Sequence, residues 1–83
     1  MKRDVKEVII QITEAYIKSS RKRIRHGVTS RELKEHIDSL KYINLQDITS
    51  YNIGKILAES KKFISELKWS SKYSQDLNHW RLK

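Results

Sequence analysis

The sequence has no cysteine, no proline and only two glycines among its 83 residues. Without cysteine the chain can form neither disulfide bonds nor a thiolate metal site. The absence of proline and the scarcity of glycine argue against a disordered or linker-rich protein. A chain of this length is expected to form one domain with one modest core, for which dimerisation would be a further source of stability.

Long apolar runs and enzyme motifs are also absent. No apolar stretch approaches the ~20 residues needed to cross a bilayer, and the basic N-terminus lacks the apolar segment of a signal peptide. There is no Gly-rich phosphate loop, no G-x-S-x-G and no H-E-x-x-H, and His26, His36 and His79 lack ligand spacing. We therefore expect an intracellular, cytoplasmic protein that is not an enzyme and binds no metal, cofactor or small-molecule ligand.

Positive charge is abundant, with 18 Lys and Arg against 10 Asp and Glu and a formal net charge of +8. A small domain with this excess usually has an anionic partner, either nucleic acid or an anionic membrane surface. The candidate membrane-surface helix, residues 4–20, has only Lys6 and Lys18 to set against its acidic residues. That balance is poor for membrane binding, so nucleic acid is favoured and no membrane partner is expected.

Apolar spacing predicts a first helix over residues 4–20. Its main stripe consists of Val5, Ile9, Ile12 and Tyr16. Ile10 and Ile17 lie off this stripe and are seven residues apart, which is also a helical repeat. Two interpretations stay open: a broad buried face, or a second seam that pairs two copies of the chain in a homodimer.

A second helix is predicted over residues 30–40, after a very short strand at Val28. Thr29 and Glu32 have the T-x-x-E spacing of a capping box, in which each side chain satisfies a backbone N–H of the other. The buried stripe of this helix is expected to be Leu33, Ile37 and Leu40. The connection that follows is too apolar for a free linker, and part of Tyr42, Ile43 and Leu45 should pack on the core.

Two stretches offer phosphate contacts. Ser30 and Arg31 lie in the exposed first turn of the second helix, where backbone N–H groups and Arg can hold a phosphate. The other stretch is a basic run of Arg21, Lys22, Arg23 and Arg25. This run is either a solvated loop or a second set of phosphate contacts.

A third helix is predicted over residues 49–60, with Thr49 as its N-cap and Asp47 as the alternative cap. Its apolar seam consists of Ile53, Ile56 and Leu57, and its opposite face carries Ser50, Tyr51, Asn52, Lys55 and Glu59. Asn can make paired hydrogen bonds to adenine, Lys can reach guanine or phosphate, and hydroxyl groups can bond either. This face predicts a DNA recognition helix.

After residue 60 the apolar period becomes alternating, which predicts a β-hairpin over residues 63–83. One face of the first strand carries Phe63, Leu67 and Trp69, and the other carries Ile64, Glu66 and Lys68. Trp80 and Leu82 alternate in the same way near the end, and residues 70–78 are polar turn material. Trp69 and Trp80 are expected on the buried side of the hairpin.

The order helix, short strand, helix, helix, hairpin resembles the winged helix-turn-helix superfamily over about residues 5–83. The segments VTSRELKEHI, SYNIGKIL and the closing HWRLK carry the resemblance, which is greatest to small stand-alone regulators of archaea and their viruses and plasmids. The resemblance implies a mainly α fold of the α+β class with three helices and a two-stranded wing. It also implies groove positions at Ser50, Tyr51, Asn52 and Lys55, phosphate positions at Ser30, Arg31, Lys61 and Lys62, and wing positions at Lys68, Lys72 and Tyr73.

The expected function is therefore sequence-specific binding of double-stranded DNA by a homodimeric transcription regulator associated with the nucleoid. One alternative is a winged helix that binds protein or RNA within a transcription, replication or translation complex. RNA binding would require exposed aromatic side chains, and Tyr51 and Tyr73 are the two that fit. Another alternative is a non-specific architectural DNA-binding protein.

Overall fold

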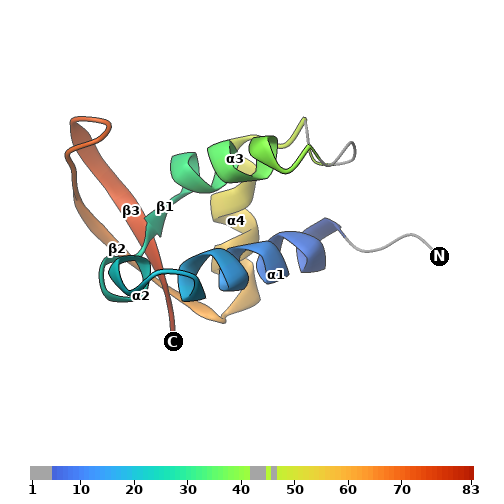
Figure 1. Cartoon of the computed structure of the whole chain (residues 1–83), viewed down its shortest axis with the longest axis horizontal. Coiled ribbons are helices and arrows are strands. Elements are labelled where there is room, and N and C mark those ends of the chain that lie inside the picture. Colours follow the sequence, from blue (N-terminus) through green and yellow to red (C-terminus); the bar gives the residue numbers. More distant parts are fainter. Residues whose placement is uncertain (1–4, 42–44, 46) are drawn as a thin grey trace.

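The computed structural model describes residues 5–41, 45 and 47–83. Within these residues the chain is a small α+β domain with four helices and a three-stranded antiparallel sheet in the order β1-β3-β2. The elements are α1 (Val5–Lys18), α2 (Arg21–His26), β1 (Val28–Thr29), α3 (Ser30–Ser39), α4 (Ser50–Ser60), β2 (Phe63–Ser70) and β3 (Gln75–Leu82). The larger helices α1, α3 and α4 pack together, and the hairpin of β2 and β3 extends beside them (Figure 1), with Lys72 of its turn bonded to Glu35 of α3.

The N-cap half of the predicted capping box at Thr29 and the predicted N-cap at Thr49 are present. Thr29 Oγ1 accepts a hydrogen bond from the Glu32 backbone N–H at 3.1 Å, and Thr49 Oγ1 accepts one from the Asn52 N–H at 3.1 Å. Each bond satisfies a backbone donor that the first turn of a helix leaves without a partner. The starts of α3 and α4 were therefore predicted correctly, and Thr49 rather than Asp47 caps α4.

The buried face of α1 differs from the predicted stripe. Ile9, Thr13 and Ile17 are its fully buried residues, and Thr13 Oγ1 donates to the Ile9 carbonyl at 2.8 Å, which satisfies the buried hydroxyl. Because Ile17 is 0% exposed and Ile10 packs against the core, the predicted dimer seam through Ile10 and Ile17 is wrong. The alternative interpretation, a broad buried face, is confirmed.

The basic run forms the short helix α2 rather than a loop. Arg23 anchors it to the end of α1, because its Nε donates to the Tyr16 carbonyl at 2.7 Å and its Nη2 donates to Ser19 Oγ at 2.6 Å. The Arg23 guanidinium also lies 4.1 Å from the centre of the Tyr16 ring. A carbonyl left without a helical partner at the C-terminal end of α1 is thereby satisfied, so Arg23 has a structural role.

His36, which stacks on Tyr16, is expected to make the stability of the fold depend on pH. The His36 ring lies 4.1 Å from the Tyr16 ring, centroid to centroid. Burial and the nearby Arg23 charge lower the pKa of His36 below its usual value. The unfolded chain therefore binds a proton at His36 more readily than the folded chain does. Protonation of His36 costs no stability above about pH 6.5, and the free energy of unfolding falls as the pH drops toward the pKa of His36 in the folded chain.

We therefore expect the midpoint temperature of thermal unfolding, measured by circular dichroism, to decrease as the pH is lowered from about 7 to about 5.5. A His36→Phe variant keeps the ring stacking and should be less sensitive to pH across this window. A variant with the same slope as the parent protein would place the dependence on other groups.

The core joins the helices to one end of the sheet. Its buried apolar side chains are Ile9, Ile17, Val28, Leu33, Ile37, Leu45, Ile53, Leu57, Phe63 and Trp80. Leu45 confirms that part of the connection before α4 packs on the core, whereas Tyr42 and Ile43 lie outside the described residues. The predicted burial of Leu40 is wrong, since this residue follows the last turn of α3 and is 40% exposed.

The second strand of the hairpin begins earlier than predicted. The turn occupies residues 71–74, so that residues 75–78, predicted as turn material, form the first part of β3. The predicted strand at Val28 is confirmed, and Val28 pairs with Trp80. Leu67 and Trp69 are 67% and 62% exposed, so their predicted burial is wrong. They lie on the same face as buried Phe63 but closer to the turn, beyond the part of the sheet that the core covers.

Candidate nucleic-acid interface

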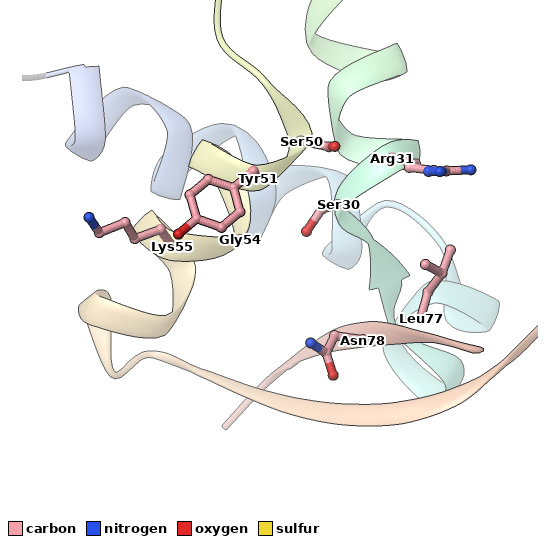
Figure 2. Close-up of a pocket in the computed structure, with 8 residues that line it drawn as sticks. All are labelled: Ser30, Arg31, Ser50, Tyr51, Gly54, Lys55, Leu77 and Asn78. Carbon is pink, nitrogen blue, oxygen red and sulfur yellow. The ribbon is translucent and has the colours of Figure 1, made fainter. Parts of the chain in front are cut away.

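A hollow of about 460 Å³ lies between α4, the first turn of α3 and strand β3. It is lined by Ser30, Arg31, Ser50, Tyr51, Gly54, Lys55, Leu77 and Asn78 (Figure 2). The predicted groove residues of α4 and the predicted phosphate residues of α3 thus lie on one surface. Asn52 is exposed on α4 beside this surface but does not line the hollow.

Trp80 and Gly54 both pack against Ser30, one of the residues that line the hollow. The Trp80 indole N–H donates to Ser30 Oγ at 3.2 Å. A Cβ on Gly54 would lie 3.2 Å from the same oxygen and 3.9 Å from the Trp80 ring. Glycine inside a helix costs about 0.5–1 kcal/mol relative to alanine, and here its small size lets α4 approach the first turn of α3 closely.

Two cationic side chains border the hollow on opposite sides. Figure 2 shows Arg31 and Lys55 extending away from each other, with Tyr51 and the Ser30 and Ser50 hydroxyls between them. Tyr51 is 76% exposed, so its ring and hydroxyl are open to a ligand. Positive charge on both sides of a surface rich in hydrogen-bonding groups suits a partner with two rows of phosphates.

The hairpin holds Arg31 in place. The Arg31 guanidinium lies 5.3 Å from the centre of the Tyr73 ring. With the Gln75 amide oxygen turned toward it, Arg31 donates to that oxygen from Nη1 at 2.9 Å and from Nη2 at 3.2 Å. Tyr73, a predicted wing contact, is half-buried, and its ring lies beside the Arg31 guanidinium of α3.

The predicted wing lysines also contact the protein itself. Lys68 Nζ donates to the His26 carbonyl at 3.0 Å, and Lys72 Nζ donates to Glu35 Oε2 at 2.8 Å. The bond to Lys72 lowers the pKa of Glu35 and raises the pKa of Lys72. These bonds connect the hairpin to α2 and α3.

Other predicted phosphate residues lie away from the hollow. Lys61 ends α4 in a left-handed conformation, with φ of 60°, and Lys62 Nζ lies 3.9 Å from Glu14 Oε1. Both follow the end of α4 remote from Ser50, ~16 Å along the helix axis. Glu59 was expected on the groove face. Its Oε2 lies 3.8 Å from Lys6 Nζ on α1, and Glu59 does not line the hollow.

The basic run borders a second hollow, of about 580 Å³, between α2 and the hairpin. Lys22 and Arg23 line it together with Lys68 and His79. The side chains of Lys68 and His79 project from the sheet face opposite to that of Trp80, because side chains alternate along a strand. Arg21 and Arg25 are exposed on α2 but are not brought to the first hollow.

Sequence reasoning missed Gly54, Leu77 and Asn78. The glycine carried a signal, because a glycine within an apolar helical pattern often marks close packing. Leu77 and Asn78 carried none, because they were predicted in a turn and reach the hollow only when β3 lies beside α4.

Within the described residues, no three His, Asp or Glu side chains form a group suited to a metal ion. None of the described helices has both the length and the apolar character needed to cross a bilayer. Comparison with known proteins gave no matching family, no matching curated protein and no matching solved structure. Function must therefore be argued from the geometry of the hollow and the charges around it.

Proposed function

We propose that the chain is a winged helix-turn-helix protein that binds double-stranded DNA in a sequence-specific manner as a transcription regulator. In this proposal α4 enters the major groove and the hairpin of β2 and β3 acts as the wing. One observation carries the proposal. Arg31 and Lys55 lie on opposite sides of a hollow, and helix α4 presents Ser50 and Tyr51 to that hollow between them.

The dimensions and chemistry of B-DNA fit this arrangement. The major groove is about 12 Å wide, admits one α-helix and has a row of phosphates on each side. Arg31, held by Tyr73 and Gln75, would contact one row. Tyr51 and Asn52, exposed at the front of α4, would reach base edges, and Lys55 would contact guanine or phosphate.

Selection of bound sequences from a random duplex pool, at two salt concentrations, tests the proposal. We expect one enriched motif, and binding that weakens with salt by a logarithmic slope of about −0.9 per phosphate contact. Salt-sensitive binding without an enriched motif would instead indicate an architectural DNA-binding protein. Absence of binding at low salt would overturn the proposal.

Asn52→Ala separates base contacts from phosphate contacts. If Asn52 makes a paired bond to adenine, its loss should cost ~1–3 kcal/mol on the selected site and leave random DNA unaffected. Arg31→Ala is the control, since removal of a phosphate contact should weaken binding to all sequences alike. Fluorescence anisotropy with both duplexes measures the two effects. Equal affinity of Asn52→Ala and the parent protein for the selected site would refute the groove assignment of Asn52.

The exposed aromatic side chains favour RNA as a second candidate partner. Trp69 joins Tyr51 as a solvent-exposed ring, and single-stranded RNA is commonly bound by stacking of bases on such rings. Competition of a single-stranded RNA of equal length against the selected duplex tells the two apart. Preference for the RNA would favour the second candidate.

A further inference from the structure

The hairpin has an open edge. Among residues 5–41, 45 and 47–83 the strand order is β1-β3-β2, and β2 pairs with β3 on one side only. Besides β3, the element that packs most on β2 is α4. An unpaired edge presents backbone N–H and C=O groups that can pair with another strand. β2 is eight residues long, contains no proline and keeps an unbroken register with β3, so these common protections of an edge are missing.

Exposed apolar side chains lie along the same edge strand. Leu67 and Trp69 are 67% and 62% exposed on one face, and Ile64 is 43% exposed on the other. Leu67 and Trp69 are neighbours on the same face, and contiguous exposed apolar side chains mark interaction surfaces. This pair also lies beside the hollow, because Leu67 pairs with Asn78 across the sheet.

We propose that two copies of the chain pair through the open edge of β2, as antiparallel strands related by a two-fold axis, with Leu67 opposite Leu67 of the second copy. The result would be a six-stranded sheet in which Leu67 and Trp69 gain apolar or small cross-strand neighbours from the second copy. This interface takes the place of the excluded seam on α1. It does not depend on DNA binding, and it can be tested on the protein alone.

The sequence of β2 selects the register. Facing residues of an antiparallel pair lie on the same side of the sheet, so a two-fold register can shift only in steps that keep this match. Two such registers pair seven residues of each β2 strand within its bounds, one centred on Glu66 and one on Leu67. The first would set Glu66 against Glu66 of the second copy, and like charges directly opposite are destabilising.

The register centred on Leu67 is self-complementary. It sets Glu66 opposite Lys68 of the second copy, and by symmetry Lys68 opposite Glu66, so that the dimer gains two cross-strand ion pairs. Leu67 meets its own copy at the axis, and Trp69 lies opposite Ser65, which leaves room for the indole. In the single chain Arg81 Nη2 lies 3.4 Å from Glu66 Oε2, and Lys68 Nζ donates to the His26 carbonyl. The side chains of Glu66 and Lys68 therefore already lie on the sheet face where the new ion pairs would form.

The symmetry also places the two hollows. A two-fold axis through an antiparallel edge pair is perpendicular to the sheet and keeps each face on its own side. The two α4 helices, which pack on the Phe63 and Trp80 face, would therefore lie on one side of the six-stranded sheet. Both could face a single DNA molecule, and the selected motif would then be a palindrome.

A single cysteine tests the register directly, since the chain contains none. In the Leu67→Cys variant, the two sulfur atoms lie across the axis at a Cα separation within the range of disulfides. In the Ser65→Cys control, the two cysteines would be offset by four residues, ~13 Å along the strand. We expect Leu67→Cys to form a cross-linked dimer under mild oxidation, and Ser65→Cys to form little. Equal cross-linking of the two variants would overturn the register.

Exchange of the two charges tests the ion pairs. Glu66→Lys sets lysines opposite each other, and Lys68→Glu does the same with acidic residues, so either change should raise the dimer dissociation constant about tenfold or more. The double variant restores the pairing with reversed signs and should recover the dimer. Sedimentation measures the mass, and circular dichroism confirms the fold. A monomeric parent protein at all concentrations, or a double variant no better than the singles, would overturn the proposal.

Discussion

Replacement of Trp80 by alanine is expected to lower the free energy of unfolding by about 3–5 kcal/mol, the typical cost of removing a buried aromatic side chain. Trp80 is 6% exposed, and it joins the elements that the chain must bring together. It pairs with Val28 of β1 and Ser65 of β2, and its indole donates to Ser30 Oγ at the start of α3. Alanine would leave a cavity among all three, and a domain this small has little stability to lose.

Trp69→Ala is the matched control, because it removes the same side chain from an exposed position. With Trp69 62% exposed, the free energy of unfolding in dilute protein should change by about 0.5 kcal/mol or less. Urea titrations of the parent protein and both variants, followed by circular dichroism, give the comparison. Equal losses for Trp80→Ala and Trp69→Ala would mean that the hairpin packs differently from the structure described here.

The two tryptophans also show where sequence reasoning succeeds and where it stops. Alternation correctly placed Phe63, Trp69 and Trp80 on one face of the hairpin, because side chains alternate along any strand. Burial, however, depends on how far the helices extend over that face. The core reaches Phe63 and Trp80 but not Trp69, and no local pattern encodes that limit.

Helix starts were predictable for the opposite reason, since a cap is a local device. Thr29 and Thr49 each bond a backbone N–H three residues further on, so the signal and the structure lie in the same short segment. The structure of the basic run was not predicted, because Arg23 interacts with Tyr16 and Ser19, which lie outside the run. These contacts exist only in the folded chain, so the helix could not be predicted from the basic run, for which a solvated loop or phosphate contacts were the two interpretations.

The candidate site divides in the same way. Ser50, Tyr51 and Lys55 were predictable from the period of one helix, because the opposite face of α4 is apolar. The hollow itself depends on Gly54, Leu77 and Asn78, which meet across α4 and β3. Long-range pairing of this kind sets the shape of a surface, whereas the sequence pattern predicts which side chains the helix presents.

Lys55→Glu is expected to cause the largest loss of DNA affinity among single changes at the hollow. Lys55 lies on the exposed face of α4, across the hollow from Arg31 (Figure 2). Reversal of its charge removes one contact and adds repulsion from the phosphates. The cost should be ~2–4 kcal/mol at low salt, which corresponds to an affinity loss of about 30- to 1,000-fold, with less loss as salt screens the repulsion.

Lys41→Glu makes the same change in net charge at a different place and so serves as the control. Lys41 follows α3 at the end remote from Arg31, ~15 Å along the helix axis, and its reversal should reduce affinity only through the overall field of the protein. Both lysines are exposed, so neither change should unfold the chain, which thermal unfolding confirms. If fluorescence anisotropy finds the same loss for both variants, the hollow is not the DNA-binding surface, and binding follows net charge instead. A loss confined to Lys55→Glu would leave α4 as the helix that contacts DNA, whatever the number of copies that bind together.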